Sequence, residues 1–215
     1  MELENYSYSK TFFWMFIGLL ITFVTGYYVS LNENMLYNIC TGGMHFLLFI
    51  VEIIIVIVLT RRLHKMSDMT AKILFCLYSF VTGLTFSVLF YAYSMQSIMY
   101  VFAVTGLLFL VFAFLGKTIN IDLSKLGSIF MMILIGLLIV SIINIFIGST
   151  MLELVLSWVF VILFLGITAY DIQRAKQLMI IYGEEKGSIM TALQLYLDFI
   201  NIFIELLKLF GKSRD

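Results

Sequence analysis

Long apolar segments follow one another along the chain and are separated by short polar connections. They cover residues 11–31, 37–60, 71–93, 97–115, 128–147, 152–170 and 189–210. Each segment can cross the roughly 30 Å hydrocarbon core of a bilayer as an α-helix, which needs about 20 residues. A transmembrane β-barrel would instead show alternating segments of about 10 residues. The pattern therefore predicts an all-α membrane protein with seven transmembrane helices in a single domain over residues 1–215.

The composition agrees with this fold class and excludes several functions. The chain is 62% hydrophobic and 12% charged, with a mean hydropathy of +1.08, whereas soluble domains are about half apolar and a quarter charged. Seven spans leave almost no chain for a soluble catalytic domain, and we expect no enzyme activity. Lys and Arg balance Asp and Glu at 13 each, which gives no basic surface for nucleic acid. Cys40 and Cys76 lack the spacing of a disulfide framework or a zinc site, and no cofactor is expected.

The positive charges predict the orientation of the chain. The connections near residues 31–36, 94–96 and 148–150 carry no Lys or Arg. The positive-inside rule therefore places the amino terminus in the cytoplasm of a multi-pass cell-membrane protein. Lys208 at the end of the last segment and Lys212 and Arg214 after it are also positive, so either the last helix departs from this rule or it is re-entrant and ends inside. Positive charge lies before the first segment and in or beside the other connections. The residues are Lys10, Arg61, Arg62, Lys65, Lys72, Lys117, Lys125, Arg174, Lys176 and Lys186.

Four acidic residues lie within apolar segments or at their edges: Glu52, Asp171, Asp198 and Glu205. An ionisable group at membrane depth costs about 2.5 to 3.5 kcal/mol even on the most lenient scale, and it marks a functional site by default. About 13 Å of helix separates Glu52 from Arg61. We therefore expect Glu52 to find a partner elsewhere or to bind a proton.

The polar residues of the last segment share one helix face. They recur at steps of three and four residues, which is the spacing of one face of an α-helix. Such a face cannot point to lipid and must face other helices or water inside the protein. Gln194 and Asn201 either hydrogen-bond between packed helices or line a pathway, whereas the charge of Asp198 and Glu205 favours a functional role. The members of this face are Thr191, Gln194, Asp198, Asn201, Glu205, Lys208 and Lys212.

Asp171 and Asp198 are predicted to lie at nearly the same depth. Residues 183–187 have Gly at both ends and are predicted to form a tight turn between the last two helices. The two aspartates are about equally far from this turn, so an antiparallel hairpin brings their carboxyl groups together. Two carboxylates in contact at low dielectric retain one proton, and calcium prefers carboxylate oxygens. The pair is therefore a candidate proton switch and transient calcium site. The alternative keeps Asp171 at the cytoplasmic interface, paired with Arg174 or Lys176.

Two segments carry a resemblance to a known family. LQLYLDFINIFIELLKLFG at residues 193–211 and AYDIQ at residues 169–173 closely resemble the Bax inhibitor family of membrane proteins in its short bacterial form. The resemblance implies seven helices, six of them wrapped around a central carboxy-terminal helix. It also implies a pH-sensitive calcium leak across the membrane, with calcium as the permeant ion.

The resemblance also implies roles for individual residues. Asp171 and Asp198 match the family's two-aspartate pH sensor. In the family, an arginine that ends the second helix is a latch to the first of these aspartates, and both Arg61 and Arg62 are candidates here. Glu205 departs from the pattern, because bacterial relatives can have a neutral amide at this place.

Two other functions remain open. The first is a non-conducting regulator that binds other membrane proteins through its helices. The second is an intramembrane aspartyl protease, because two membrane-embedded aspartates that share a proton are the requirement of that chemistry. Asp198, however, lies in LYLD, without the glycines of the protease GxGD motif. The expected partners are calcium ions, protons, the lipid bilayer and, for a regulator, other membrane proteins.

Overall fold

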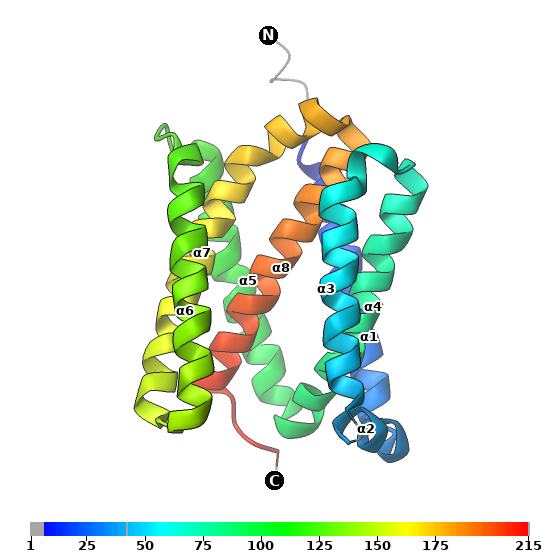
Figure 1. Cartoon of the computed structure of the whole chain (residues 1–215), viewed down its shortest axis with the longest axis vertical. Coiled ribbons are helices and arrows are strands. Elements are labelled where there is room, and N and C mark those ends of the chain that lie inside the picture. Colours follow the sequence, from blue (N-terminus) through cyan, green and yellow to red (C-terminus); the bar gives the residue numbers. More distant parts are fainter. Residues whose placement is uncertain (1–6, 42, 215) are drawn as a thin grey trace. The chain divides into compact units, whose positions relative to one another are not determined.

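The computed structural model describes residues 7–41 and 43–214, and this part of the chain is almost entirely helical (Figure 1). It contains eight α-helices, two short 3-10 helices and one isolated β-bridge within the described residues. The predicted all-α fold is confirmed. The elements are α1 Ser9–Ser30, α2 Glu33–Cys40, α3 Met44–Arg62, η1 Leu63–Lys65, α4 Asp68–Ala92, α5 Met95–Thr118, η2 Leu123–Leu126, α6 Gly127–Ile147, α7 Thr150–Tyr182 and α8 Glu184–Phe210.

Six helices in the described chain are long and apolar enough to cross a membrane: α1, α4, α5, α6 together with η2, α7 and α8. The predicted second span, residues 37–60, is not continuous, because α2 and α3 meet at a bend of 76°. Gly43 precedes α3 with a φ of 78°, a left-handed conformation that glycine adopts at little steric cost. By length and composition, the described residues therefore contain six candidate spans, or seven if α2 and α3 form one broken span.

The chain forms two compact units. The first comprises residues 1–95, 175–196 and 213–215, and the second comprises residues 96–174 and 197–212. Helices α7 and α8 contribute residues to both. The single domain expected over residues 1–215 stays a prediction.

Small residues allow α1 and α4 of the first unit to approach closely, as is common in membrane helix pairs. A Cβ atom at Gly83 would lie 2.6 Å from the Cβ of Thr25. The fully buried Tyr196 of α8 joins this pair, since its hydroxyl lies 2.6 Å from the hydroxyl of Thr22. Its ring packs edge-on against Tyr78, with centroids 5.8 Å apart. The tyrosine of the LYLD sequence thus fixes the first half of α8 against α1 and α4.

The contacts of α8 with the two ends of α4 show that it crosses the full length of the first unit. At its start, Glu185 forms ion pairs with Lys10 at 2.6 Å and with Lys72, near the start of α4, at 2.7 Å. After its end, Ser213 forms the β-bridge with Tyr93, directly after α4. The last helix therefore runs in the same direction as α4.

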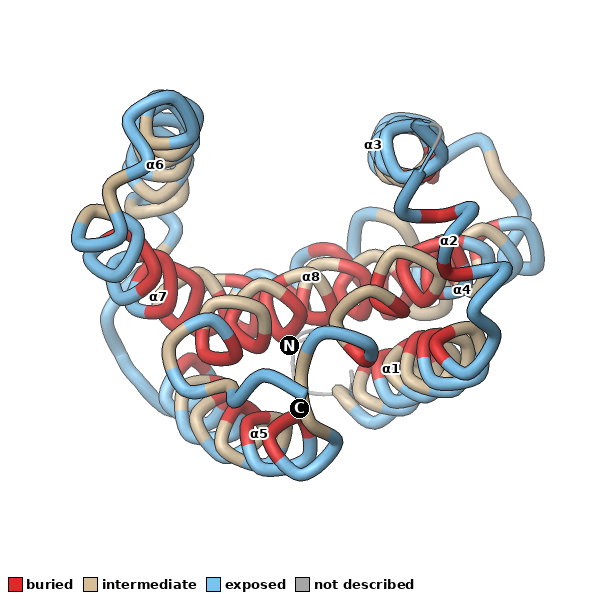
Figure 2. Tube along the Cα trace, turned by 90° about the horizontal axis from the view of Figure 1, so that it is seen from below, coloured by how far each residue is buried: buried red, intermediate tan, exposed pale blue. Residues whose placement is uncertain are grey.

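Burial differs strongly between the spanning helices (Figure 2). In its most apolar window, α8 has 72% of its residues buried, the largest share among the six, whereas α6 has none. The shared polar face predicted for the last segment agrees with this enclosure. The arrangement of six helices around α8 stays a prediction.

The predicted turn at residues 183–187 is wrong in extent. Helix α7 continues to Tyr182, and the single residue Gly183, with a φ of 83°, separates it from α8. Gly187 lies inside α8, where an added Cβ atom would be 2.5 Å from the Cα of Met179. This glycine therefore permits close packing of α8 on α7 and does not form a turn.

Candidate functional site

Both predicted aspartates are buried in the second unit. Asp171 on α7 is 5% exposed and Asp198 on α8 is 3% exposed. The charge of Asp171 acts on Asp198, so the two carboxyl groups are electrostatic neighbours. The Oδ2 atom of Asp198 is fully buried and has no hydrogen-bond partner among the described residues. A buried carboxylate oxygen without a partner is costly, which makes this the least satisfied ionisable group of the unit.

Thr168, which precedes Asp171 by about one turn of α7, is the hydroxyl next to this pair. Its side chain interacts with Asp198, and its hydroxyl donates to the carbonyl oxygen of Phe164 at 2.8 Å. A hydroxyl donates a single proton but accepts through two lone pairs. While Thr168 donates to Phe164, its oxygen can accept a hydrogen bond from Asp198 only if that carboxyl group carries a proton.

The positive charge that acts on Asp171 comes from its own helix. It is Arg174, whose guanidinium donates to the hydroxyl of Tyr170 at 3.4 Å. None of the ion pairs within 4 Å in the described residues involves Asp171. The alternative, an ordinary helix-end charge that pairs with Arg174 or Lys176, is not supported, because Asp171 is buried and forms no such pair within the described residues.

Close helix packing fixes the position of the pair. A Cβ atom at Gly116 of α5 would lie 2.3 Å from the carbonyl oxygen of Ala169, two residues before Asp171. At Gly127, the first residue of α6, it would lie 2.7 Å from the hydroxyl of Tyr170. The contacts leave α7 little room to move against α5 and α6 unless these helices move too.

Gln173, the last residue of the AYDIQ sequence, connects α7 to a neighbouring part of the chain through two hydrogen bonds. Its side-chain oxygen accepts from the backbone N–H of Leu123 at 2.7 Å, and its side-chain nitrogen donates to the carbonyl oxygen of Ile121 at 2.9 Å. It thereby ties α7 to the connection between α5 and η2.

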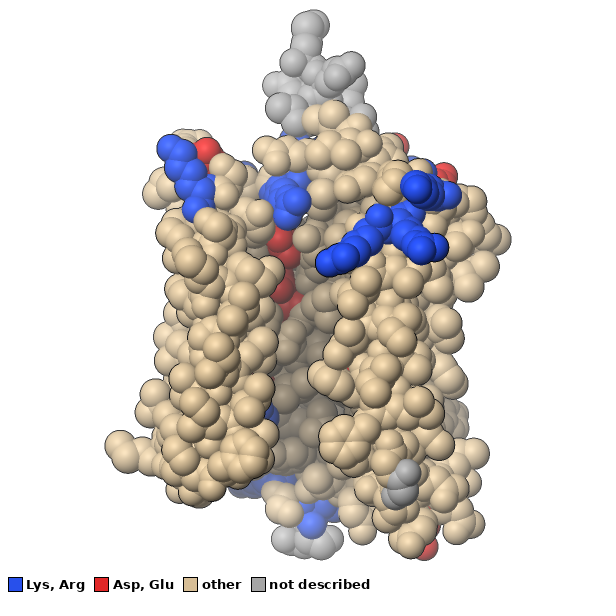
Figure 3. Space-filling view, viewed as in Figure 1, with Lys and Arg blue, Asp and Glu red and all other residues tan. Residues whose placement is uncertain are grey.

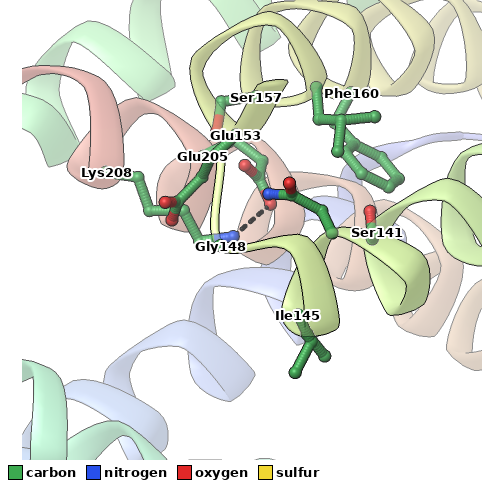
Figure 4. A pocket seen from close by; sticks show the side chains of 10 residues that line it. Ser141, Ile145, Gly148, Glu153, Ser157, Phe160, Glu205 and Lys208 are labelled. Atoms are coloured by element: carbon green, nitrogen blue, oxygen red, sulfur yellow. Dashed lines mark hydrogen bonds and ion pairs between the residues drawn. The ribbon is translucent and has the colours of Figure 1, made fainter. Parts of the chain in front are cut away.

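A second polar site in the same unit is a cavity of about 390 Å³ (Figure 4). Glu205 and Lys208 form an ion pair of 2.8 Å at this cavity. Glu205 follows Asp198 by seven residues on α8, or about 10 Å along the same helix face. The cavity is lined by Ser141, Asn144, Ile145, Gly148, Glu153, Leu156, Ser157, Phe160, Glu205 and Lys208.

Only Glu205 and Lys208 of this cavity were predicted from the sequence; Ser157 and Glu153 are among the residues that were not. Ser157 is 2% exposed and lines the cavity beside Glu205. Glu153 lies in the first turn of α7, where an acidic residue is ordinarily explained by the helix dipole. The only signal that could have singled it out is its place just inside the apolar segment at residues 152–170.

The other predicted polar residues differ in their hydrogen bonds. Glu52 on α3 is half-buried, and its Oε1 accepts from the hydroxyl of Thr85 at 3.0 Å in the first unit. The same hydroxyl lies 2.8 Å from the carbonyl oxygen of Thr82, so the expectation that Glu52 has a partner for its charge or binds a proton stays a prediction. The side chain of Asn201 donates to the carbonyl oxygen of Leu197 in its own helix at 2.7 Å. The buried side-chain oxygen of Gln194 has no partner among the described residues.

Arg61 and Arg62 are exposed at the end of α3. They belong to the first unit and Asp171 to the second, so the latch stays a prediction. Within residues 7–41 and 43–214, no three His, Cys, Asp or Glu side chains are grouped in a way that could hold a metal ion. The transient calcium site at Asp171 and Asp198 also stays a prediction.

Comparison with known proteins shows the family. The family described as "Inhibitor of apoptosis-promoting Bax1" matches residues 4–215. The chain is 38% identical over 211 residues to an uncharacterized protein of Deinococcus radiodurans, covering 96% of this chain and 90% of that protein. It is 35% identical over 219 residues to an uncharacterized protein of Borreliella burgdorferi, with 99% and 94% covered. It is 36% identical over 217 residues to the inner membrane protein YbhL of Escherichia coli K12, with 96% and 91% covered. The similarity predicted from LYLDFIN and AYDIQ is thus confirmed, and the chain belongs to the Bax inhibitor family of membrane proteins.

Proposed function

We propose that this protein is a calcium leak channel of a bacterial inner membrane, and that its conductance depends on pH through Asp171 and Asp198. The observation that carries the proposal is the buried Oδ2 atom of Asp198, which has no hydrogen-bond partner among the described residues and lies beside a second buried carboxyl group. The membrane location follows the printed description of the relative from Escherichia coli.

The two protonation states of the pair give the two states of the channel. With one shared proton, the carboxyl groups hydrogen-bond to each other and hold α7 against α8. After the proton leaves, two like charges in a low-dielectric site repel each other. The repulsion is relieved either by separation of the helices or by a cation between the oxygens, and calcium prefers such ligands. Proton release and calcium entry are therefore coupled at one site.

Glu205 extends the acidic path along α8. It lies about two turns beyond Asp198 and opens onto the 390 Å³ cavity. A calcium ion that leaves the pair would meet this carboxylate next, where Lys208 competes with it for Glu205. Arg61 or Arg62 latches the closed state by pairing with the ionised Asp171.

The test is calcium entry into liposomes that contain the purified full chain, measured with a trapped dye between about pH 6 and 8. The wild-type flux should change with pH. Asp171→Asn and Asp198→Asn should each flatten this response, because a single carboxyl group no longer shares a proton. The matched control is Asp122→Asn, in the connection before η2. Hydrogen bonds from the side chain and backbone of Ser124 hold the pKa of Asp122 below its ordinary value, so it remains ionised throughout this range.

Two outcomes would contradict the proposal in different ways. No calcium flux above that of protein-free liposomes at any pH would favour a non-conducting regulator. A flux that keeps the wild-type pH profile in both aspartate variants would retain the channel but remove the pair as its sensor. Glu52 and Glu205 would then be the carboxyl groups to replace.

A further inference from the structure

The first unit contains a cavity whose walls are strongly basic. It has a volume of about 730 Å³ and lies where α3 ends and α4 begins. Figure 3 shows Lys and Arg side chains gathered over the end of α3. The lining residues are Val58, Arg61, Arg62, His64, Lys65, Met66, Thr70 and Leu74.

The positive charges at this cavity have no acidic partners. None of the ion pairs in the described residues involves Arg61, Arg62 or Lys65. In the same unit, Lys10 forms ion pairs with Glu184 and Glu185 at 3.3 and 2.6 Å, and Lys72 forms one with Glu185 at 2.7 Å. Two other basic side chains near these helix ends therefore have acidic partners.

A further cation lies beside the cavity. Lys186 donates to the carbonyl oxygen of Met66 at 3.2 Å, where the chain passes from η1 to α4. Its hydrogen bond fixes this connection and adds positive charge at the rim. The cations around the cavity therefore outnumber the acidic residue of this connection, Asp68, which forms no ion pair within the described residues.

The level of the cavity in the membrane indicates what binds there. Helix α3 ends at Arg62 and α4 begins at Asp68, so the cavity lies at the ends of two apolar helices, where lipid headgroups meet the hydrocarbon core. Val58 of α3 and Leu74 of α4 provide apolar walls on the side towards the helix centres. A ligand that matches both features has an anionic head and an apolar tail.

We propose that this cavity binds the phosphate headgroup of an anionic phospholipid. Guanidinium groups bind phosphate oxygens through two parallel N–H donors, and Arg61 and Arg62 provide two such groups. Lys65 adds a point charge, and basic pockets at helix ends are typical sites for anionic headgroups. The apolar walls favour a lipid over free phosphate. The proposal does not depend on ion conduction.

The experiment titrates the purified full chain in neutral detergent with short-chain phosphatidylglycerol and counts bound lipid by native mass spectrometry. Phosphatidylcholine and inorganic phosphate are the comparison ligands. Replacing Arg61, Arg62 and Lys65 together by Gln should weaken phosphatidylglycerol binding by about fivefold per charge, or about a hundredfold in total. Lys65→Gln alone should weaken it by about fivefold and tests the proposal if the triple variant fails to fold. Lys125→Gln removes one exposed cation from η2 of the second unit and should leave binding unchanged.

Three results would overturn the proposal. Equal affinity of the wild type and the Lys65→Gln and triple variants for phosphatidylglycerol would show that the lipid binds elsewhere. Equal affinity of the wild type for phosphatidylcholine would indicate a general lipid annulus. Displacement of phosphatidylglycerol by millimolar inorganic phosphate would indicate a site for free phosphate. Selective binding that falls in the charge variants, and only there, would support a headgroup site.

Discussion

A single methyl group added at Gly116 should destabilise the second unit. The new Cβ atom would lie 2.3 Å from the carbonyl oxygen of Ala169, whereas ordinary contacts begin at 3.4 Å. The obstructing atom belongs to the backbone of α7 and cannot rotate away, so α5 and α7 must separate by about 1 Å. Overpacking of this kind costs about 1–3 kcal/mol. Because Ala169 lies two residues before Asp171, the displacement also reaches the aspartate pair.

Gly106→Ala is the matched control for Gly116→Ala. Both glycines lie in α5, but a Cβ atom at Gly106 would meet nothing within 4 Å. Each variant gains the same intrinsic helix propensity, up to about 1 kcal/mol, so the difference between them isolates the contact with Ala169. At about 2–4 °C per kcal/mol for a chain of this size, Gly116→Ala should have a Tm roughly 2–12 °C lower than Gly106→Ala. Thermal unfolding in one detergent and at one heating rate measures this difference. Equal Tm values in the two variants would refute the reasoning.

The remaining predictions concern orientation and the latch. Cysteine labels at Lys65 and Asn34 should lie on opposite sides of the membrane, with Lys65 in the cytoplasm, and labelling of both from one side would contradict the orientation. A label at Arg214 should lie on the side of Asn34, because α8 crosses the first unit fully. Arg61→Ala or Arg62→Ala, but not both, should raise calcium flux at a given pH, since loss of the latch frees Asp171. Wild-type flux in both variants would leave these arginines without a role in gating.

The sequence predicts the spans better than their ends. The length of an apolar segment is sufficient to identify a helix that must cross hydrocarbon, and this criterion located most of the spanning helices. It did not show that α7 continues through Asp171 and Arg174 to Tyr182, because polar residues at a helix end do not stop a helix that packs against protein. It also did not show the break at Gly43, since a left-handed glycine and an ordinary helical glycine are identical in sequence.

Gly187 is a second glycine whose structural role the sequence did not predict. A glycine at the end of a charged stretch is typical of a turn, yet this one lies inside α8 against Met179. Close backbone contact depends on the neighbouring helix, which the local pattern does not contain. The candidate site was predicted where an energetic cost is visible in the sequence, as at Asp171 and Asp198. Glu153, which also lines the cavity, was not predicted, because an acidic residue at the start of a helix has no comparable energetic cost.

The contrast in burial between α6 and α8 has a consequence for biogenesis. Helix α6 is the most apolar of the six spanning helices and has no buried residue in its most apolar window, so lipid alone can stabilise it as soon as it leaves the translocon. Helix α8 has the lowest mean hydropathy of the six and is mostly enclosed by protein, so it needs partners that are already inserted. Because synthesis begins at the amino terminus, α8 is made last, after those partners have entered the membrane. A chain stalled before α8 would leave the surfaces that receive it uncovered, which makes that intermediate a natural substrate for membrane quality control.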